Sequence, residues 1–356
     1  MSLGDRAVSE AYLRYTGRKI TLILAGIIAL FLLLVTAVSV GPVTIPFTDV
    51  IWIFAGQGET LKWNAIIWNI RLPQAITAII AGVGLSVAGV AMQSILRNPL
   101  GSPFTLGISN AAAFGAAMSV IVLGAGEMTS TFTDAVIINN PYLISFAAFT
   151  TSMIATAVIL AISRMRSASP EVMVLAGVAL ASLFSAGTMT LQYFADDTQL
   201  AAIVFWTFGD VGRAGWTEIT IMGIIVTIAT VYFILNSWNY NAVSTGDEMA
   251  KGLGVNVTRL RLVGMVVASV VSSVTVAFLG IIGFVGLVCP HMVRRLIGDD
   301  HRFLIPGSAV MGGILLLAAD TCARMVLAPQ LLPVAVLTAF IGAPTFIYLL
   351  LYKSRV

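Results

Sequence analysis

Long apolar runs separated by short polar segments make up most of the chain. An apolar run of about 20 residues is long enough for a helix to cross roughly 30 Å of hydrocarbon. No segment shows the alternating pattern that is typical of membrane barrel strands. We therefore predict an all-α polytopic membrane protein with ten transmembrane helices, at residues 20–40, 74–94, 104–124, 142–163, 172–194, 217–237, 262–280, 283–294, 306–323 and 331–352.

The composition excludes an ordinary soluble domain. Of the 356 residues, 58% are hydrophobic and only 10% are charged, and the mean hydropathy is +0.99. A soluble domain carries about 25% charged residues. The longest predicted outer segments, residues 41–70 and 125–141, are too short to hold a separate soluble domain. We expect residues 1–356 to form one transmembrane domain.

The positions of the basic residues predict the orientation in the membrane. Four of them precede the first span, which predicts that residues 1–19 form a cytoplasmic N-terminal segment. If alternate loops are placed inside, both termini are cytoplasmic, and the only Lys and Arg residues left outside are Lys62, Arg71, Arg213 and Arg324. The net charge of +3 therefore indicates a positive-inside bias and no nucleic-acid partner. The first span lacks a clear cleavage site, so we expect a retained helix and not a signal peptide.

Residues 262–293 contain no Lys, Arg, Asp or Glu. As one helix this segment would be about 48 Å long, well beyond the thickness of the hydrocarbon. Arginines flank both of its ends, which favours a hairpin of two short spans with both ends inside. Gly280, Gly283 and Gly286 would allow the turn, and Pro290 should break the helical hydrogen-bond ladder near the inner surface. A single tilted helix is the alternative.

Ionisable residues are rare within the predicted spans, where a pump or membrane enzyme would need them. Asp320 is the clear exception. Arg324 follows it on the same helical face, which favours a structural ion pair near the outer end of the span. Cys289 and Cys322 lie in apolar surroundings, and we expect both to be small buried residues and not a disulfide or a metal pair.

Glycine and alanine recur at small-xxx-small spacing in several spans, for example at Gly82, Gly89 and Gly115. Such residues allow helix backbones to approach closely in lipid. We therefore interpret most of these glycines as packing sites.

Motifs for catalysis are absent from the sequence. It contains no GxxxxGK[ST] phosphate loop, no HExxH, no paired-Cys motif and no GxSxG elbow. His291 and His301 are ten residues apart beside arginines, which is not a metal-ligand spacing. We expect no metal, no cofactor and no enzyme activity of its own in this chain. If transport is active, its energy must come from another subunit.

The longest charged segment on the predicted inner side is SWNYNAVSTGDEMAKGLGVNVTRLR, residues 237–261. Gly246 can begin a short helix whose first turn carries Asp247 and Glu248. Acidic residues are favourable at that position because the N-terminal end of a helix is positive.

Gly252 and Gly254 then allow a sharp turn into a second short helix from about Asn256. Two short helices at the membrane surface could dock a soluble partner. A solvated connector is the alternative, which composition alone slightly favours.

Six motifs occur in one order along the chain and cover nearly all of it from Arg71 onward. They are RLPQAITAIIAGVGLSVAGVAMQSILRNPLGSPFTLGISNAAAFGAAM (71–118), FWTFGDVGRAGW (205–216), KGLGVNVTRLR (251–261), IGFVGLVCPHMVRRLIGDDHR (282–302), AADTCAR (318–324) and LLPVAVLTAFIGAPTFIYLL (331–350). In these motifs the chain resembles the FecCD-type permeases of ABC importers.

The resemblance implies the type II ABC importer permease fold, with ten spans per subunit. It also implies a permease in the cytoplasmic membrane that works as a homodimer, or as a pair of homologues. Two cytoplasmic ATPase subunits, which use ATP and Mg, and an extracytoplasmic substrate-binding protein would be its partners. The cargo, an iron–siderophore chelate, haem or cobalamin, would pass through the dimer interface.

The resemblance also assigns roles to residues. It implies a cytoplasmic coupling loop at 238–261, in which the ATPase-coupling residues are Gly246, Asp247, Glu248, Lys251, Gly252, Leu253, Gly254 and Val255. The residues that it implies for the structural motifs are Asn98, Pro99, Gly283, Phe284, Gly286, Pro290 and His291.

Arg71 and Arg324 match the outward arginines that meet acidic residues of the binding protein. The chain departs from the family pattern at Gln74, where a second arginine is expected, and this removes one docking charge per subunit. The inner gate corresponds loosely to Ser169, Pro170 and Glu171.

An ion-coupled secondary transporter is the competing hypothesis. It would explain the many spans, but it would not explain why the spans lack ionisable residues. The sequence leaves open which chelate is carried, with a smaller oxyanion as a further alternative. It also leaves open whether the partner permease is identical.

Overall fold

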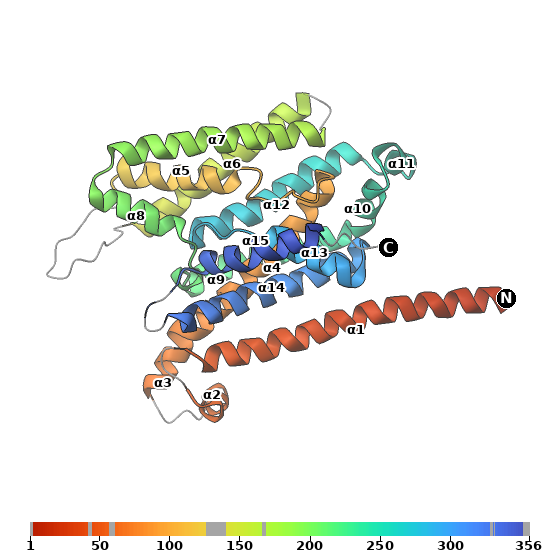
Figure 1. The fold of residues 1–356 in the computed structure, drawn as a ribbon, viewed down its shortest axis with the longest axis horizontal. Helices are drawn as coiled ribbons and strands as arrows, with labels where there is room; N and C mark the ends of the chain where they lie inside the picture. Colours follow the sequence, from red (N-terminus) through yellow and green to blue (C-terminus); the bar gives the residue numbers. More distant parts are fainter. Residues whose placement is uncertain are drawn as a thin grey trace.

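The computed structural model describes residues 3–41, 45–56, 61–125, 140–165, 169–327, 330 and 332–351. Within these ranges the chain is helical and contains no strand (Figure 1). In chain order the helices are α1 (Leu3–Ser39), α2 (Phe47–Phe54), α3 (Leu61–Ile66), the π-helix η1 (Ile67–Arg71), α4 (Leu72–Ile95), α5 (Ile108–Ile121), α6 (Pro141–Met165), α7 (Pro170–Phe194), α8 (Asp197–Thr207), the 3-10 helix η2 (Val211–Arg213), α9 (Trp216–Leu235), α10 (Ser237–Ser244), α11 (Asp247–Gly252), α12 (Val257–Leu279), α13 (Val285–Ile297), α14 (His301–Val326) and α15 (Val334–Leu351).

Every predicted span coincides with a helix, although some bounds differ. Seven helical segments in the described residues are long and apolar enough to cross a membrane. The segment 104–124 is shorter than predicted, since α5 begins only at Ile108, after Gly107 turns the chain with φ +75. The N-terminal segment differs as well, because α1 begins at Leu3 and continues into the first span.

α4 is the central helix of the bundle, and it meets two neighbours backbone to backbone. A Cβ built on Gly82 would overlap the carbonyl oxygen of Gly312 in α14, and the reverse is also true. A Cβ on Gly89 would overlap the carbonyl oxygen of Gly286 in α13. These contacts confirm the prediction of close packing at Gly82 and Gly89 and show which helices approach there.

α5, α6 and α7 form a layer on one side of α4, while α1 lies on the opposite side (Figure 1). Within this layer α5 and α6 approach closely at Gly115, where a Cβ would overlap Thr151 Oγ1. Thr151 Oγ1 also donates a hydrogen bond to the carbonyl of Ala111 at 2.8 Å. α1 packs mainly along α14, and most of its apolar surface is exposed.

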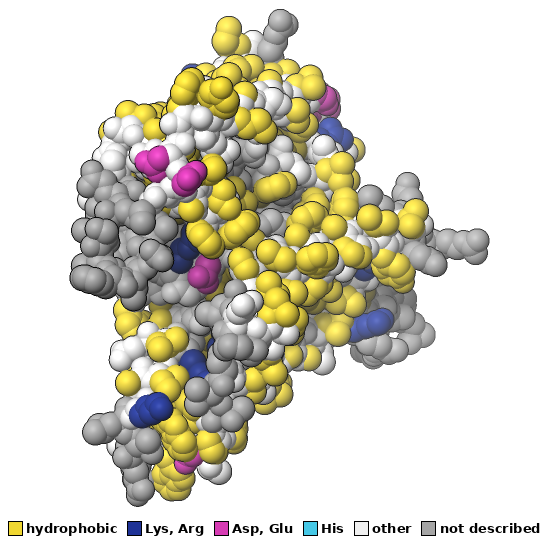
Figure 2. Space-filling view, turned by 60° about the vertical axis from the view of Figure 1, so that its left-hand side comes forward, with side chains coloured by type: hydrophobic (Ala, Val, Ile, Leu, Met, Phe, Trp, Pro, Cys, Tyr) yellow, Lys and Arg dark blue, Asp and Glu magenta, His cyan; other side chains and the backbone are white. Residues whose placement is uncertain are grey.

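The surface of the molecule is mostly hydrophobic. Figure 2 shows one face on which Lys, Arg, Asp and Glu side chains are few and scattered among apolar ones. Large exposed side chains include Phe31, Ile154, Ile228 and Phe340, each on an apolar helix. Such a surface is suited to lipid and not to water.

The segment 262–293 reverses direction, as the hairpin prediction required. α12 ends at Leu279, and α13 begins at Val285. Gly280 turns the chain with φ +79, but the second left-handed residue is Phe284, with φ +67, and not a glycine. A single continuous helix is therefore excluded.

Pro290 breaks the hydrogen-bond ladder of α13, as predicted, but the helix continues through it. Proline has no N–H to donate to the carbonyl four residues earlier, which here belongs to Gly286. The buried Gln93 of α4 brings its amide Nε2 to 3.5 Å from that oxygen and 3.4 Å from the carbonyl oxygen of Leu287. A side chain of a neighbouring helix thus stands in for the missing donor.

The two cysteines differ in their surroundings. Cys289 is buried in the packed face of α13, as predicted. Cys322 is exposed, so the prediction for it is wrong. An apolar neighbourhood in the sequence does not distinguish a core position from one that faces lipid, since both favour apolar residues.

Candidate functional site

The short helix α11 forms where the sequence predicts it. Gly246 precedes it with φ +125, a conformation that favours glycine, and Asp247 and Glu248 occupy its first turn. Gly252 is its last residue, and Gly254 turns the chain with φ +83.

The prediction of a second short helix from Asn256 is wrong. Asn256 caps the long helix α12, and its side chain accepts a hydrogen bond from the backbone N–H of Arg259 at 2.9 Å. The second short helix is α10, which precedes α11. Apolar residues continue beyond Arg261 for a full span, and this continuation makes a short second helix impossible here.

Asp247 connects α11 to two other elements. Its carboxylate accepts two hydrogen bonds of 2.7 Å from Arg261 on α12. Arg97, in the loop after α4, lies 3.7 Å from the same carboxylate. The Arg261 side chain is only 4% exposed, so the ion pair is well shielded on one side. α11 is thereby fixed to the ends of two membrane helices.

α10 is anchored to the start of α14. Asn241 donates to Asp300 at 2.9 Å and accepts from the backbone N–H of His301 at 2.8 Å. His301 Nε2 lies 2.6 Å from the hydroxyl of Ser94 on α4. Burial opposes ionisation of Asp300, but hydrogen bonds from Arg302 and Asn241 outweigh it and lower the pKa of this carboxyl to about 2.

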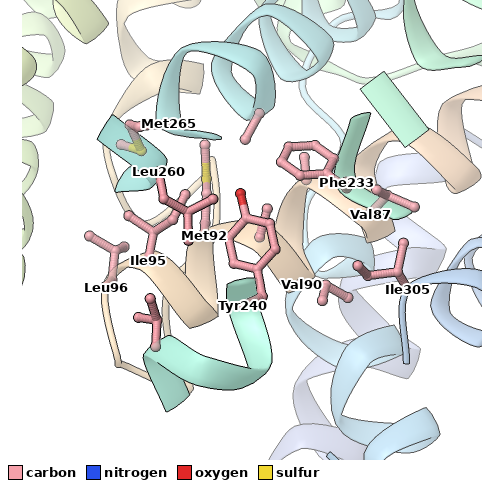
Figure 3. Close-up of a cluster of buried hydrophobic side chains, with 14 of the residues drawn as sticks. Val87, Val90, Met92, Ile95, Leu96, Phe233, Tyr240, Leu260, Met265 and Ile305 are labelled. Atoms are coloured by element: carbon pink, nitrogen blue, oxygen red, sulfur yellow. The ribbon is translucent and has the colours of Figure 1, made fainter. Parts of the chain in front are cut away.

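Tyr240 links α10 to the apolar core. Its ring stacks on His301, with ring centroids 5.9 Å apart, and contacts Phe233 of α9. Figure 3 shows Tyr240 among Met92, Val90 and other apolar side chains that belong to α4, α9, α12 and α14. Burial raises the pKa of the Tyr240 phenol well above its usual range, so the ring remains neutral. A displacement of α10 must therefore move the packed core.

The outer face of α11 is exposed, and two large apolar side chains lie on this helix and directly after it. Met249 is 63% exposed, and Leu253, the C-cap of α11, is 68% exposed. They are four residues apart, and Lys251 and Glu248 form an ion pair of 2.9 Å beside them. An apolar pair with a polar rim, held on a fixed helix, is suited to binding a protein. Sequence reasoning missed Met249, although its spacing from Leu253 on a polar segment was the available signal.

Three of the predicted structural motif residues, Asn98, Pro99 and His291, lie near the end of α4. Pro99 and His291 are far apart in the sequence, yet His291 Nε2 lies 2.8 Å from the carbonyl oxygen of Pro99. Arg294 of α13 donates to Gln93 at 3.0 Å. Asn98 shapes the turn, since its side chain accepts from the backbone N–H of Leu100 at 2.9 Å. The second half of α13 therefore attaches to the last turn of α4 and the loop after it.

The predicted gate residues lie at the beginning of α7. Ser169 precedes the helix, Pro170 is its first residue, and the Ser169 hydroxyl contacts the Glu171 carboxylate. A stripe of exposed residues runs from there along the whole helix. We call it the α7 stripe, and it consists of Glu171, Leu175, Val178, Ala179, Ser182, Leu183, Ala186, Met189, Thr190, Tyr193 and Phe194. Spacing of three or four residues places them on one helical face, which no described element covers.

Arg71 and Arg324 are both buried at the other end of the bundle, with 4% and 5% exposure. Arg71 donates to the carbonyls of Val38 and Ser39 at 2.8 Å each, and Arg324 donates to Ala37 at 3.2 Å. Their guanidinium groups thus hold the last turn of α1. To meet a partner's carboxylate they would have to leave these contacts, so their docking role stays a prediction.

Asp320 pairs with Arg324 at 3.1 Å, as the sequence predicts. Gln74, which stands where the family pattern has an arginine, donates to Asp320 at 2.8 Å. Gln74 is therefore part of an internal network, together with this ion pair. Within the described residues, no group of three or more His, Cys, Asp or Glu side chains could hold a metal ion.

Comparison with known proteins identifies the family. The model of the FecCD transport family matches residues 25–352. The chain belongs to the FecCD transport family. A protein of Methanocaldococcus jannaschii, named as an ABC transporter permease, is 54% identical over 344 residues, which cover 97% of this chain and 98% of the relative. The hemin transport system permease protein HmuU of Yersinia pestis is 35% identical over 291 residues, which cover 81% of this chain and 84% of the relative.

A solved structure has a similar fold. It is described as an inward-facing conformation of a metal-chelate type ABC transporter, and it superposes with a TM-score of 0.80 at 28% identity. The match covers 94% of this chain and 99% of that chain. With this family and its long apolar helices, the chain is a multi-pass membrane protein.

Proposed function

We propose that this chain is the membrane-spanning permease subunit of an ATP-binding-cassette importer for a metal chelate. The proposal rests on the exposure and the attachment of α11. Met249 on this helix and Leu253 directly after it are exposed apolar residues, and Asp247 joins the helix to α12. Movement of a partner bound to α11 would therefore be transmitted to membrane helices. Relatives named as hemin and ABC transporter permeases support the same function.

ATP hydrolysis belongs, in this proposal, to two separate cytoplasmic subunits that dock on the coupling loop 238–261. This chain then binds neither ATP nor Mg itself. The contact residues are Gly246, Asp247, Glu248, Met249, Lys251, Gly252, Leu253, Gly254 and Val255. The α11 face is small, so the rest of the coupling loop has to add to the area buried against the partner.

The proposed topology has ten spans in one domain, with both termini in the cytoplasm. α1 begins and α15 ends at the end of the bundle that carries α10 and α11 (Figure 1). The shorter helices α5, α13 and α15 complete the count beyond the seven long segments. Protein covers much of α13, which suits a span too short to cross lipid alone.

A second copy of this chain would cover the α7 stripe. Small residues at Ala179, Ser182 and Ala186 lie along its middle and allow a second helix to approach closely. The cargo would pass along this interface, between the two copies. Ser169, Pro170 and Glu171 stand at the inner end of the stripe, where they would form the gate.

A substrate-binding protein would deliver the cargo at the opposite end of the bundle. Arg71 and Arg324 are its proposed contacts, provided that docking draws them away from the end of α1. The cargo class is a metal chelate, with an iron–siderophore, haem and cobalamin as the candidates. The relative named for hemin supports this class.

The test is ATP hydrolysis by the complex in lipid nanodiscs, with the binding protein added empty and then loaded with each chelate. Leu253→Glu should abolish copurification of the ATPase, whereas Leu253→Met, which keeps an apolar side chain of similar size, should retain it. If no ATPase copurifies and uptake follows a proton or sodium gradient, the ion-coupled transporter is the correct function.

A further inference from the structure

A polar cavity of about 330 Å³ opens between the inner ends of α9, α10 and α12. Asn236 and Asn239 line it on one side, and Asn256 and Arg259 line it on the other. No Asp or Glu is among its lining residues. The charge at this cavity is therefore positive.

The cavity is rich in hydrogen-bond donors. Among the described residues, no ion pair joins Arg259 to a carboxylate, and its side chain is exposed. Asn256 uses Oδ1 to accept the backbone N–H of Arg259, which leaves its amide Nδ2 as a donor. The Asn239 amide donates one hydrogen bond, to Asn236 at 3.0 Å, and has a second N–H. An anion with several acceptor oxygens would satisfy these groups.

The cavity lies at the ends of the apolar parts of α9 and α12. α9 is 20 residues long, which matches the hydrocarbon thickness, so its last residue, Leu235, is close to the headgroup layer. Exposed apolar side chains continue from the cavity along both helices, at Ile228 and Val231 of α9 and at Val263 and Val266 of α12. A ligand here would meet a cationic end and an apolar flank.

We propose that this cavity binds the phosphate headgroup of an anionic phospholipid, whose acyl chains lie along α9 and α12. Basic pockets between membrane helices at the cytoplasmic surface have the charge that such headgroups need. The proposal rests on the topology of the proposed function, in which this end of α9 and α12 is cytoplasmic, and it does not depend on the cargo or on ATP.

Lipid in this cavity would also act on α11. Arg259 is two residues from Arg261, which holds Asp247, so both arginines belong to the first turns of α12. A bound headgroup would stabilise the junction between α11 and α12. Anionic lipid should therefore affect the position of the proposed coupling helix.

The experiment is native mass spectrometry of the complete complex, purified from membranes that contain dioleoyl phosphatidylglycerol and dioleoyl phosphatidylcholine in equal amounts. Arg259→Gln removes the charge, and Arg259→Lys keeps it. Arg164→Gln is the matched control, because Arg164 is also exposed and lies in the last turn of a spanning helix, α6. Copurified ATPase and the thermal melting temperature are measured for each variant.

The wild type and Arg164→Gln should retain phosphatidylglycerol over phosphatidylcholine, and Arg259→Gln should retain about tenfold less of it, as expected for a lost charge-assisted contact. Arg259→Lys should restore most of the retention. Equal retention by the wild type and Arg259→Gln would overturn the proposal. It would also be overturned if millimolar inorganic phosphate displaced the lipid and bound in its place, or if Arg259→Gln lost the ATPase subunit and kept its lipid.

Discussion

Asp247 holds Arg261 at two points, since each of its carboxylate oxygens lies 2.7 Å from a different guanidinium nitrogen. The two residues belong to different helices, α11 and α12, with the Gly254 turn between them. Bidentate pairs of this kind fix orientation as well as distance. A short helix of six residues, which would be unstable alone, thereby becomes a rigid extension of a membrane helix.

Asp247→Ala should separate α11 from α12. The buried Arg261 would lose two charge-assisted hydrogen bonds, which costs about 1.5–3 kcal/mol of folding stability. We expect a lower melting temperature of the purified protein and ATP hydrolysis that no longer responds to the binding protein. Glu248→Ala is the control for stability, since that side chain is 91% exposed, pairs with Lys251 alone among the described residues and should change stability by less than about 1 kcal/mol. Equal losses of melting temperature for the two substitutions would contradict this role of Asp247.

Gly82→Ala should force α4 and α14 apart, because the added methyl group would overlap backbone atoms of Gly312 that cannot rotate away. Overpacking costs about 1–3 kcal/mol even where side chains can adjust, so we expect at least this loss of stability. The melting temperature in detergent and the yield of folded protein measure it. Gly17→Ala on α1 meets nothing within 4 Å and should have no such effect. A normal melting temperature for Gly82→Ala would show that the helices do not pack as described.

Asp320→Asn should destabilise the protein without changing the energy source of transport. Arg324 is buried, and the loss of its counter-charge costs about 3–5 kcal/mol. Gln74→Leu removes only the hydrogen bond to Asp320 and should cost about 1.5–3 kcal/mol. Thermal melting compares the two variants, and uptake per folded molecule, measured with and without a proton gradient, tests the function. A change in ion dependence for Asp320→Asn would favour the ion-coupled transporter.

The pattern of apolar runs predicted the positions of the long helices well, since hydrocarbon thickness dictates their length. It also predicted α11, because the positive-φ glycine before it and the two acidic residues in its first turn are local signals. It did not predict α2, α3 or α8. These short helices lie in segments whose structure depends on what they pack against.

Local sequence patterns could not predict the contacts that build the site. Asp247 and Arg97 are 150 positions apart, and Gln74 and Asp320 are 246 positions apart. Periodicity shows which face of a helix is apolar, but it does not show which helix covers that face. For the same reason the sequence predicted that Gly82 would pack closely but could not predict Gly312 as its partner.

The stability contributed by Asp300 should depend on pH in a defined range. Its pKa in the folded protein is about 2, below the value of about 3.9 expected for an unfolded chain. The stabilisation is therefore fully present above about pH 4 and is lost as pH falls towards 2. The difference in melting temperature between the wild type and Asp300→Asn should be constant from pH 5 to 7 and shrink below pH 4. A difference that stays constant down to pH 2 would show that Asp300 titrates normally.

The α7 stripe leads to a test of the dimer. If two copies meet there, a cysteine at Ala186, near the middle of the stripe, should lie close to its equivalent in the partner. Cys322→Ser first removes the exposed native cysteine, whereas Cys289 is buried and can stay. Ala186→Cys should then give a dimer on mild oxidation in membranes, detected by electrophoresis and reversed by reductant.

Ile228→Cys, on the exposed face of α9, is the matched control and should remain monomeric under the same conditions. A disulfide requires Cα atoms within about 7 Å. Random encounters in the membrane would bring either position within this distance equally often, and would therefore crosslink both positions equally. Selective crosslinking at Ala186 supports an interface formed by α7. Crosslinking at Ile228 alone would place the second copy against α9, where we propose that lipid binds, and would contradict both assignments together.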